Sequence, residues 1–219
     1  MNPSLYPIPF LAVFVFFLIR AQLLKKQRQV YIFKPTATLL VIAVLCLAFL
    51  DPNQNLNYTL GILVGLIFSL GGDIALMFDN KRAFAAGLGL FLLAHIAYIV
   101  TFSLLSPFSS WEYPAMAVLA AAGVLFFMLI RSGLGKLKGP VIAYILIISL
   151  MVSRAFSTLF SPNFNQKQGL MIFFGALLFY LSDMILAANR FWRPWKYNRI
   201  SLAFYYSGQL LLALAAGYF

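Results

Sequence analysis

Acidic residues are scarce in this chain, which has 219 residues but only five Asp or Glu, one His and one Cys. Charged residues make up 10% of the sequence, whereas a soluble domain carries about 25%. The single Cys46 excludes an intramolecular disulfide framework and a cysteine-based metal site. Residues 1–10 contain no Lys or Arg, which argues against a cleaved signal peptide, because such a peptide needs a positive start.

Apolar residues are abundant instead. The chain is 63% hydrophobic and 17% aromatic, and apolar runs of roughly twenty residues recur along it, as in transmembrane helices. Lipid offers the backbone no hydrogen-bond partners, so such runs must be helices or a closed barrel. Barrel strands would alternate over about ten residues, which these continuous runs do not. The sequence therefore predicts an all-α integral membrane protein.

Eight spans are predicted within one transmembrane domain, 1–219, because the connections are too brief to hold an inserted soluble domain. The predicted spans are Leu5–Arg20, Thr36–Leu50, Tyr58–Phe78, Phe84–Leu105, Tyr113–Ile130, Gly139–Ser157, Gly169–Asn189 and Ile200–Tyr218.

The distribution of basic residues indicates how the protein is oriented in the membrane. Fourteen of the sixteen Lys and Arg lie at or near the ends of spans one, three, five and seven. By the positive-inside rule this side is cytoplasmic, and both termini face out. The net charge of +11 is thereby assigned to topology and lipid headgroups, not to nucleic acid. We expect a multi-pass protein of the bacterial inner (plasma) membrane.

The two halves of the sequence resemble each other. The segment LIRAQLLK at Leu18–Lys25 aligns with LIRSGLGK at Leu129–Lys136. GLIFSLGGD at Gly65–Asp73 aligns with GALLFYLSD at Gly175–Asp183, at an offset of 110 residues. Four spans separate each pair, so the mates run in the same direction. This pattern predicts a parallel four-plus-four repeat with halves of about 1–105 and 106–219.

Two of the five acidic residues, Asp73 and Asp183, are predicted to lie inside spans. At ~1.5 Å rise per residue, both lie roughly 7–9 Å below the cytoplasmic boundary. A buried charge is costly, so such acids face the interior of the bundle. Acidic residues inside spans therefore indicate a functional site more often than acidic residues at helix ends do. Small residues before Asp73, among them Gly65 and Ser69, share its helix face and suit close packing.

The other acids have ordinary interpretations. Asp51 and Asp79 are predicted at helix ends, and Glu112 in a loop. Arg154 is interpreted as an outer-leaflet anchor outside the site.

Further polar residues lie in spans four and eight and at the start of span two. His95 and Tyr98 share one stripe of span four, and His95 is either a satisfied core residue or a proton relay or substrate-orienting donor. In span eight, Tyr205 and Gln209 are one turn apart, and Gln209 either joins helices or binds a substrate oxygen. Lys34, before Pro35, opens span two as a snorkelling anchor or as a contact to a lipid phosphate.

In this order and spacing, these residues resemble the YhhN-type lysoplasmalogenase family of integral membrane proteins. The likeness extends over about 34–212. The chain departs from the family at Gly71-Gly72, where one bulkier apolar residue is expected. The residues that carry the likeness are Lys34-Pro35, GLIFSLGGD ending at Asp73, FLLAHIAY at Phe91–Tyr98, Leu181-Ser182-Asp183 with Ala187 and Phe191, and Tyr205-Tyr206 with Gln209.

This resemblance implies an enzyme that hydrolyses the vinyl ether of lysoplasmalogens to a fatty aldehyde and glycerophosphocholine or glycerophosphoethanolamine. Vinyl ether cleavage needs an acid, a negative charge for the oxocarbenium ion and a base for water, which two close carboxylates supply. Asp73 and Asp183 are therefore the predicted catalytic pair, and the sequence leaves open which is the acid. The predicted substrate-binding residues are Lys34, His95, Tyr98, Ser182, Tyr205 and Gln209.

No cofactor or metal is expected, and the predicted partners are the lysophospholipid substrate and bilayer lipids. Two other functions fit parallel repeats and buried acids: a proton-coupled transporter and a non-catalytic lipid-binding protein.

Overall fold

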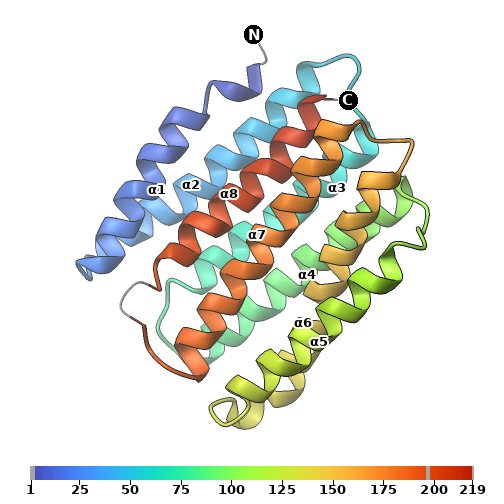
Figure 1. Ribbon diagram of the computed structural model, residues 1–219. Coiled ribbons are helices and arrows are strands. Elements are labelled where there is room, and N and C mark those ends of the chain that lie inside the picture. Colours follow the sequence, from blue (N-terminus) through green and yellow to red (C-terminus); the bar gives the residue numbers. More distant parts are fainter. Residues whose placement is uncertain (1–2, 196–197, 219) are drawn as a thin grey trace.

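The computed structural model describes residues 3–195 and 198–218, and these ranges form a bundle of helices (Figure 1). Within them, eight helices are long and apolar enough to cross a membrane, which confirms the predicted eight-span, all-α class. The helices are α1 Ile8–Leu23, α2 Gln27–Leu47, α3 Leu56–Ala75, α4 Lys81–Leu105, α5 Glu112–Ile130, α6 Lys138–Ser157, α7 Gln166–Phe191 and α8 Ile200–Ala215.

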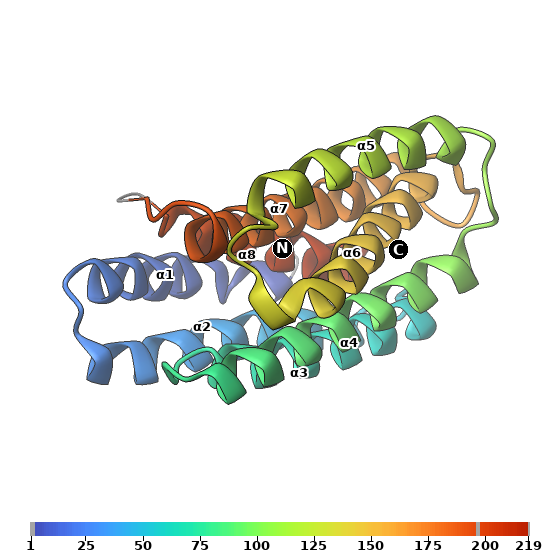
Figure 2. The same cartoon turned by 90° about the horizontal axis from the view of Figure 1, so that it is seen from below.

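Helix packing places α6 and α8 inside the bundle. Viewed from below, α3 and α4 lie on one side and α5 and α7 on the other, with α6 and α8 between them (Figure 2). The most extensive helix pairs are α3 with α4 and α7 with α8, while α2 packs on α8 and α6 packs on α4. The two ends of the chain lie at the same end of the bundle (Figure 1).

The second helix begins earlier than the sequence suggested. Its first residue is Gln27, so Lys34 and Pro35 lie inside α2 and not at its opening, and the predicted start at Thr36 is wrong. Residues 27–34 contain no Gly or Pro that would break a helix. The Gln27 side chain also donates a 2.7 Å hydrogen bond to the carbonyl of Met77, which fixes the first turn against the end of α3.

The other helix ends agree with the prediction to within a few residues. Asn side chains at 55, 80 and 165 accept backbone N–H groups and start α3, α4 and α7, as N-capping residues do. Because α3 ends at Ala75 and α7 at Phe191, Asp73 lies two residues from its helix end and Asp183 eight. Measured from the helix ends, the two acids therefore do not lie at the equal depth that the sequence predicted.

Glu112 and Arg154 form a buried ion pair, contrary to the predicted loop acid and outer-leaflet anchor. Glu112 is the first residue of α5 and is fully buried, and Arg154 Nη1 lies 2.7 and 2.8 Å from its two carboxylate oxygens. Arg154 also donates to the carbonyl of Ser106 and, at 3.0 Å, to Ser103 Oγ. The pair joins the end of α4 to α5 and α6. Because the two residues are 42 positions apart, the sequence carries no local sign of this contact.

The charge asymmetry predicts the orientation of the bundle. Epitope tags at the amino terminus and at the carboxyl terminus should both be accessible from outside intact cells. A tag beside Lys136, in the turn between α5 and α6, should be reached only after permeabilisation. A cytoplasmic terminus would contradict the orientation.

Candidate active site

Asp73 lies in a closed, highly polar cluster. Its side chain comes from α3 and is 2% exposed. Lys34 Nζ, from α2, lies 3.2 Å from Asp73 Oδ1. Oδ2 accepts hydrogen bonds from Thr38 Oγ1 at 2.6 Å and from the Tyr205 hydroxyl at 2.7 Å. A cationic partner and two hydroxyl donors thus surround this carboxylate and offset the cost of burying it.

Further hydrogen bonds connect this cluster to α4 and α8. Tyr98 donates to Gln209 Oε1 at 2.8 Å, and Gln209 Nε2 donates to Ser69 Oγ at 2.9 Å. The Tyr206 hydroxyl donates to the carbonyl of Lys34 at 3.0 Å. Tyr98 and Gln209, two predicted substrate-binding residues, therefore use these groups within the protein and join three helices.

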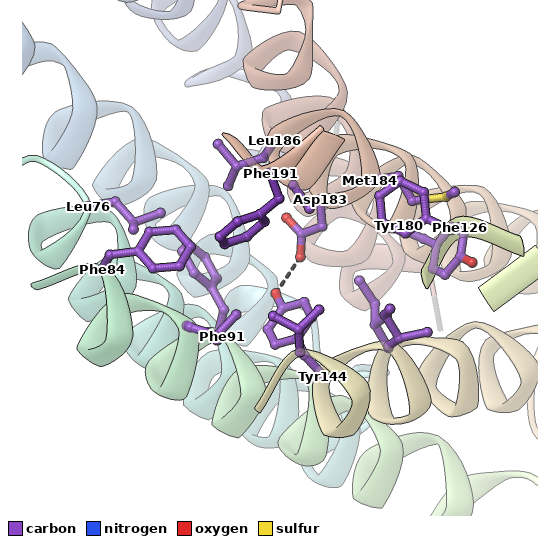
Figure 3. A pocket seen from close by; sticks show the side chains of 15 residues that line it. Leu76, Phe84, Phe91, Phe126, Tyr144, Tyr180, Asp183, Met184, Leu186 and Phe191 are labelled. Carbon is purple, nitrogen blue, oxygen red and sulfur yellow. Dashed lines mark hydrogen bonds between the residues drawn. The ribbon is translucent and has the colours of Figure 1, made fainter. Parts of the chain in front are cut away.

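Asp183 lies in a second and less polar cluster. The Tyr144 hydroxyl, from α6, donates to its Oδ2 (Figure 3), and His95 Nε2 lies 4.0 Å from the same oxygen. His95 is fully buried, and neither ring nitrogen completes a hydrogen bond of good geometry with any described residue. Its ring packs between Tyr144 and Phe179, at centroid distances of 5.3 and 4.7 Å.

Asp183 faces a narrow apolar pocket. Its side chain is 15% exposed, and the pocket has a volume of about 60 Å³, enough for a few water molecules. Figure 3 shows the Asp183 carboxylate and the Tyr144 hydroxyl among Phe84, Phe91 and Phe191. A carboxyl group in such surroundings has little to stabilise its charge.

An aromatic wall connects the two clusters. Phe91, Phe179 and Tyr205 contact one another with ring centroids 5.1 to 6.0 Å apart. Phe91 lines the Asp183 pocket, and Tyr205 binds Asp73 through its hydroxyl.

The two carboxylates therefore do not share a cavity in the described structure. Asp73 does not line the pocket, and no hydrogen bond joins it to Asp183 within the residues described, although the two charges are close enough to interact electrostatically. Ser182, another predicted binding residue, is buried beside Asp183 and does not line this pocket.

A cationic vestibule adjoins the pocket. It has a volume of about 430 Å³, and its polar lining residues include Gln22, Lys25, Lys34, Asp79, Arg190 and Arg199. Leu76, Phe84 and Leu186 line both the vestibule and the pocket, so these three side chains form their junction. The Arg190 guanidinium lies over the Phe84 ring, 3.9 Å from its centroid. An anionic group in the vestibule would thus lie next to an apolar group in the pocket.

The sequence prediction missed three residues of this region. In the sequence, Arg190 and Arg199 indicate only the topology, and Tyr144 is an ordinary residue of an apolar span. Tyr144 could have been found from the repeat, because it follows Lys34 by the same 110 residues that separate Asp183 from Asp73.

Comparison with known proteins agrees with the resemblance drawn from the sequence. A family model described as the YhhN family matches residues 29–216. The chain belongs to the YhhN family. It is 32% identical over 157 residues to "Lysoplasmalogenase TMEM86A" of Homo sapiens, covering 71% of this chain and 64% of that relative. It is also 30% identical over 178 residues to "Lysoplasmalogenase TMEM86B" of Homo sapiens, covering 79% and 71%.

A more distant member comes from Dictyostelium discoideum. This "Lysoplasmalogenase homolog" is 27% identical over 159 residues, or 62% of this chain and 52% of the relative. The match to the first human relative thus covers slightly less than two thirds of its length. No solved structure matches the chain.

Close packing of Gly65 against Tyr98 should support the Asp73 cluster. A Cβ at Gly65 would overlap the Tyr98 ring, whereas a Cβ at Gly89 would meet nothing within 4 Å. We expect Gly65→Ala to lower the free energy of unfolding by about 1–3 kcal/mol, because the ring must move away from Gln209. Thermal unfolding in detergent should show the loss for Gly65→Ala and none for Gly89→Ala. Equal midpoints would contradict the tight contact.

Proposed function

We propose that this protein is a lysoplasmalogenase-like hydrolase that cleaves the vinyl ether of a lysoplasmalogen. The products would be a fatty aldehyde and glycerophosphocholine or glycerophosphoethanolamine. The observation that carries the proposal is a carboxyl group, Asp183, in an apolar pocket that adjoins a cationic vestibule. The names of the human relatives support the same class of reaction.

The reaction begins with proton transfer to carbon. An acid protonates the vinyl carbon remote from the ether oxygen, and the carbon bonded to oxygen becomes part of an oxocarbenium ion. Water adds to that carbon and loses a proton, giving a hemiacetal. The hemiacetal then collapses: its hydroxyl loses a proton and becomes the aldehyde carbonyl, the C–O bond to glycerol breaks, and the glycerol oxygen takes up a proton. The net change is the addition of one water molecule, and no oxidant or cofactor is consumed.

Two carboxylates divide this work in our proposal. Asp183 donates the proton, because it faces the pocket where the vinyl ether would lie. Once ionised, it is the base that accepts a proton from the attacking water. Asp73, held by Lys34, supplies a fixed negative charge behind the aromatic wall, which stabilises the cation. Pairs of carboxylates serve oxocarbenium chemistry in glycosidases in the same way.

The shape of the site suits a lysolipid. The phosphate would lie in the vestibule near Arg190 and Arg199, and the vinyl ether at the junction below it. The pocket would hold only the first part of the lipid's hydrocarbon chain. The rest would follow the apolar groove between α5 and α6, which has a volume of about 410 Å³ and meets the pocket at Ile145. Lys34 is reassigned from the phosphate to Asp73, since it is 6% exposed and already paired.

Both carboxylates should be required for turnover. Asp73→Asn and Asp183→Asn should each lower kcat at least ~100-fold, the low end for acid–base catalysis. The double variant should be little worse than either single one, because the two groups act in one reaction. The measurement is aldehyde release from lysoplasmalogen by purified protein in detergent.

Asp51→Asn is the matched control, since Asp51 lies beyond the end of α2 and its Oδ1 accepts a local bond from the Asn53 amide. Near-normal turnover by either site variant would contradict the two-carboxylate mechanism. A transporter or a lipid-binding protein would release no aldehyde, with or without the substitutions.

Loss of a vestibule cation should weaken substrate binding more than chemistry. Arg190→Gln and Arg199→Gln should each raise KM several-fold with little change in kcat, because the phosphate is held alike in the ground and transition states. Arg193→Gln is the control, as Arg193 is exposed beyond α7 and does not line the vestibule. Equal KM values for all three variants would place the headgroup elsewhere.

A further inference from the structure

The two aspartate clusters are built from equivalent positions. Adding 110 to the residue numbers of Lys34 and Asp73 gives Tyr144 and Asp183. Subtracting 110 from that of Tyr205 gives His95. Lys34 and Tyr205 contact Asp73, while Tyr144 and His95 are the corresponding neighbours of Asp183. A constant offset across three helices is not expected from chance similarity of apolar segments.

The helix packing shows the same correspondence between the two halves. The α2–α8 contact that brings Lys34 near Tyr205 corresponds to the α6–α4 contact that brings Tyr144 near His95. A Cβ at Gly65 would overlap Tyr98, and a Cβ at Gly175 would lie 2.9 Å from the carbonyl of Gly208, which is the position equivalent to Tyr98. The resemblance therefore extends from sequence to packing, which supports the parallel repeat.

The two clusters differ at the positions that control charge. Lys34, a cation, corresponds to Tyr144, a neutral hydroxyl. Thr38 donates a hydrogen bond to Asp73, and its equivalent, Ile148, lines the Asp183 pocket with an apolar side chain. Relative to the Asp73 cluster, the Asp183 cluster therefore lacks the cation and both hydroxyl donors, since His95 also replaces Tyr205, and the Tyr144 hydroxyl stands in the place of the lysine.

We infer that the chain contains two copies of one carboxylate site, and that Tyr144 in place of a lysine is what allows Asp183, and not Asp73, to hold the transferable proton. The inference rests on the proposed function for the use of that proton, but the location of the proton can be tested separately. Tyr144 is a positioning residue: its hydroxyl binds Oδ2, which leaves Oδ1 to carry the proton.

Ion pairing of the other acids supports this location. Asp73 pairs with Lys34 and Glu112 with Arg154, while Asp51 and Asp79 lie outside the eight helices. Among the described residues, Asp183 has no Lys or Arg within 4.0 Å. Its titratable neighbours are Tyr144 and His95, with Asp73 acting from a greater distance.

A positive charge on His95 is also disfavoured. His95 is enclosed by aromatic rings, and burial of an unpaired charge is costly. Asp73 repels a second negative charge nearby. Both effects favour a neutral Asp183.

Infrared spectroscopy can locate the proton without substrate. A protonated carboxylic acid has a C=O stretching band that an ionised carboxylate lacks, and five acidic residues give a simple spectrum. At neutral pH in detergent, we expect one such band in the wild-type protein, retained in Asp73→Asn and lost in Asp183→Asn. No band in the wild type, or a band lost only in Asp73→Asn, would overturn the inference.

Substitutions at Tyr144 test its role. Tyr144→Lys restores the cation of the other copy, so the band should disappear and kcat should fall at least ~100-fold, as expected when acid catalysis is lost. Tyr144→Phe should keep the band at a higher frequency, because its hydrogen bond is lost, and should lower kcat more than it changes KM. Tyr58→Phe removes another buried hydroxyl, bound to the Leu212 carbonyl, and should change neither the band nor kcat.

The outcomes separate the two proposals. Aldehyde release by the wild type tests the proposed function, and the infrared band tests the site of the proton. A band lost in Asp183→Asn without any aldehyde release would retain the inference about the proton and reject the reaction. Persistence of the band in Tyr144→Lys would reject the role of Tyr144 even if the wild type is active.

Discussion

Burial of a negative charge is the constraint on which this structure depends. Removing a carboxylate from water costs several kcal/mol, and the cost is offset only by a close partner and well-formed hydrogen bonds. At Asp73 the offset comes from Lys34, Thr38 and Tyr205, which belong to two further helices. The ion pair and the two hydrogen bonds therefore also hold α2, α3 and α8 together. Asp183 lacks such a partner, and its different environment is the basis of the proposed chemistry.

The sequence predicted the eight helices well because each is a long apolar run, and run length is a local property. The prediction failed where long-range contacts determine a helix end or the position of a charged side chain. Pro35 suggested a helix start, yet contacts of Gln27 with the end of α3 extend α2 past it. Glu112 and Arg154 looked like unrelated surface charges, since nothing local shows that two distant residues will meet in the interior.

The candidate site was predictable in part. Asp73, Asp183 and His95 stand out because charged and titratable residues are rare inside spans. Their grouping was harder to predict, since it depends on which helices are neighbours: Lys34, expected at a phosphate, forms an ion pair with Asp73 instead. Tyr144 is an ordinary residue in an apolar helix and becomes noticeable only when the two halves are compared at a fixed offset.

The junction at Leu76, Phe84 and Leu186 has a consequence for equilibrium. It separates a polar chamber from an apolar one, and the proposed reaction cuts an amphiphile at that boundary. The aldehyde produced would dissolve in the bilayer and the glycerophospho compound in water. Once the products occupy different phases, they seldom meet again, so dilution into two solvents opposes the reverse reaction and product inhibition. A membrane location would thus help drive the hydrolysis to completion, in addition to supplying its substrate.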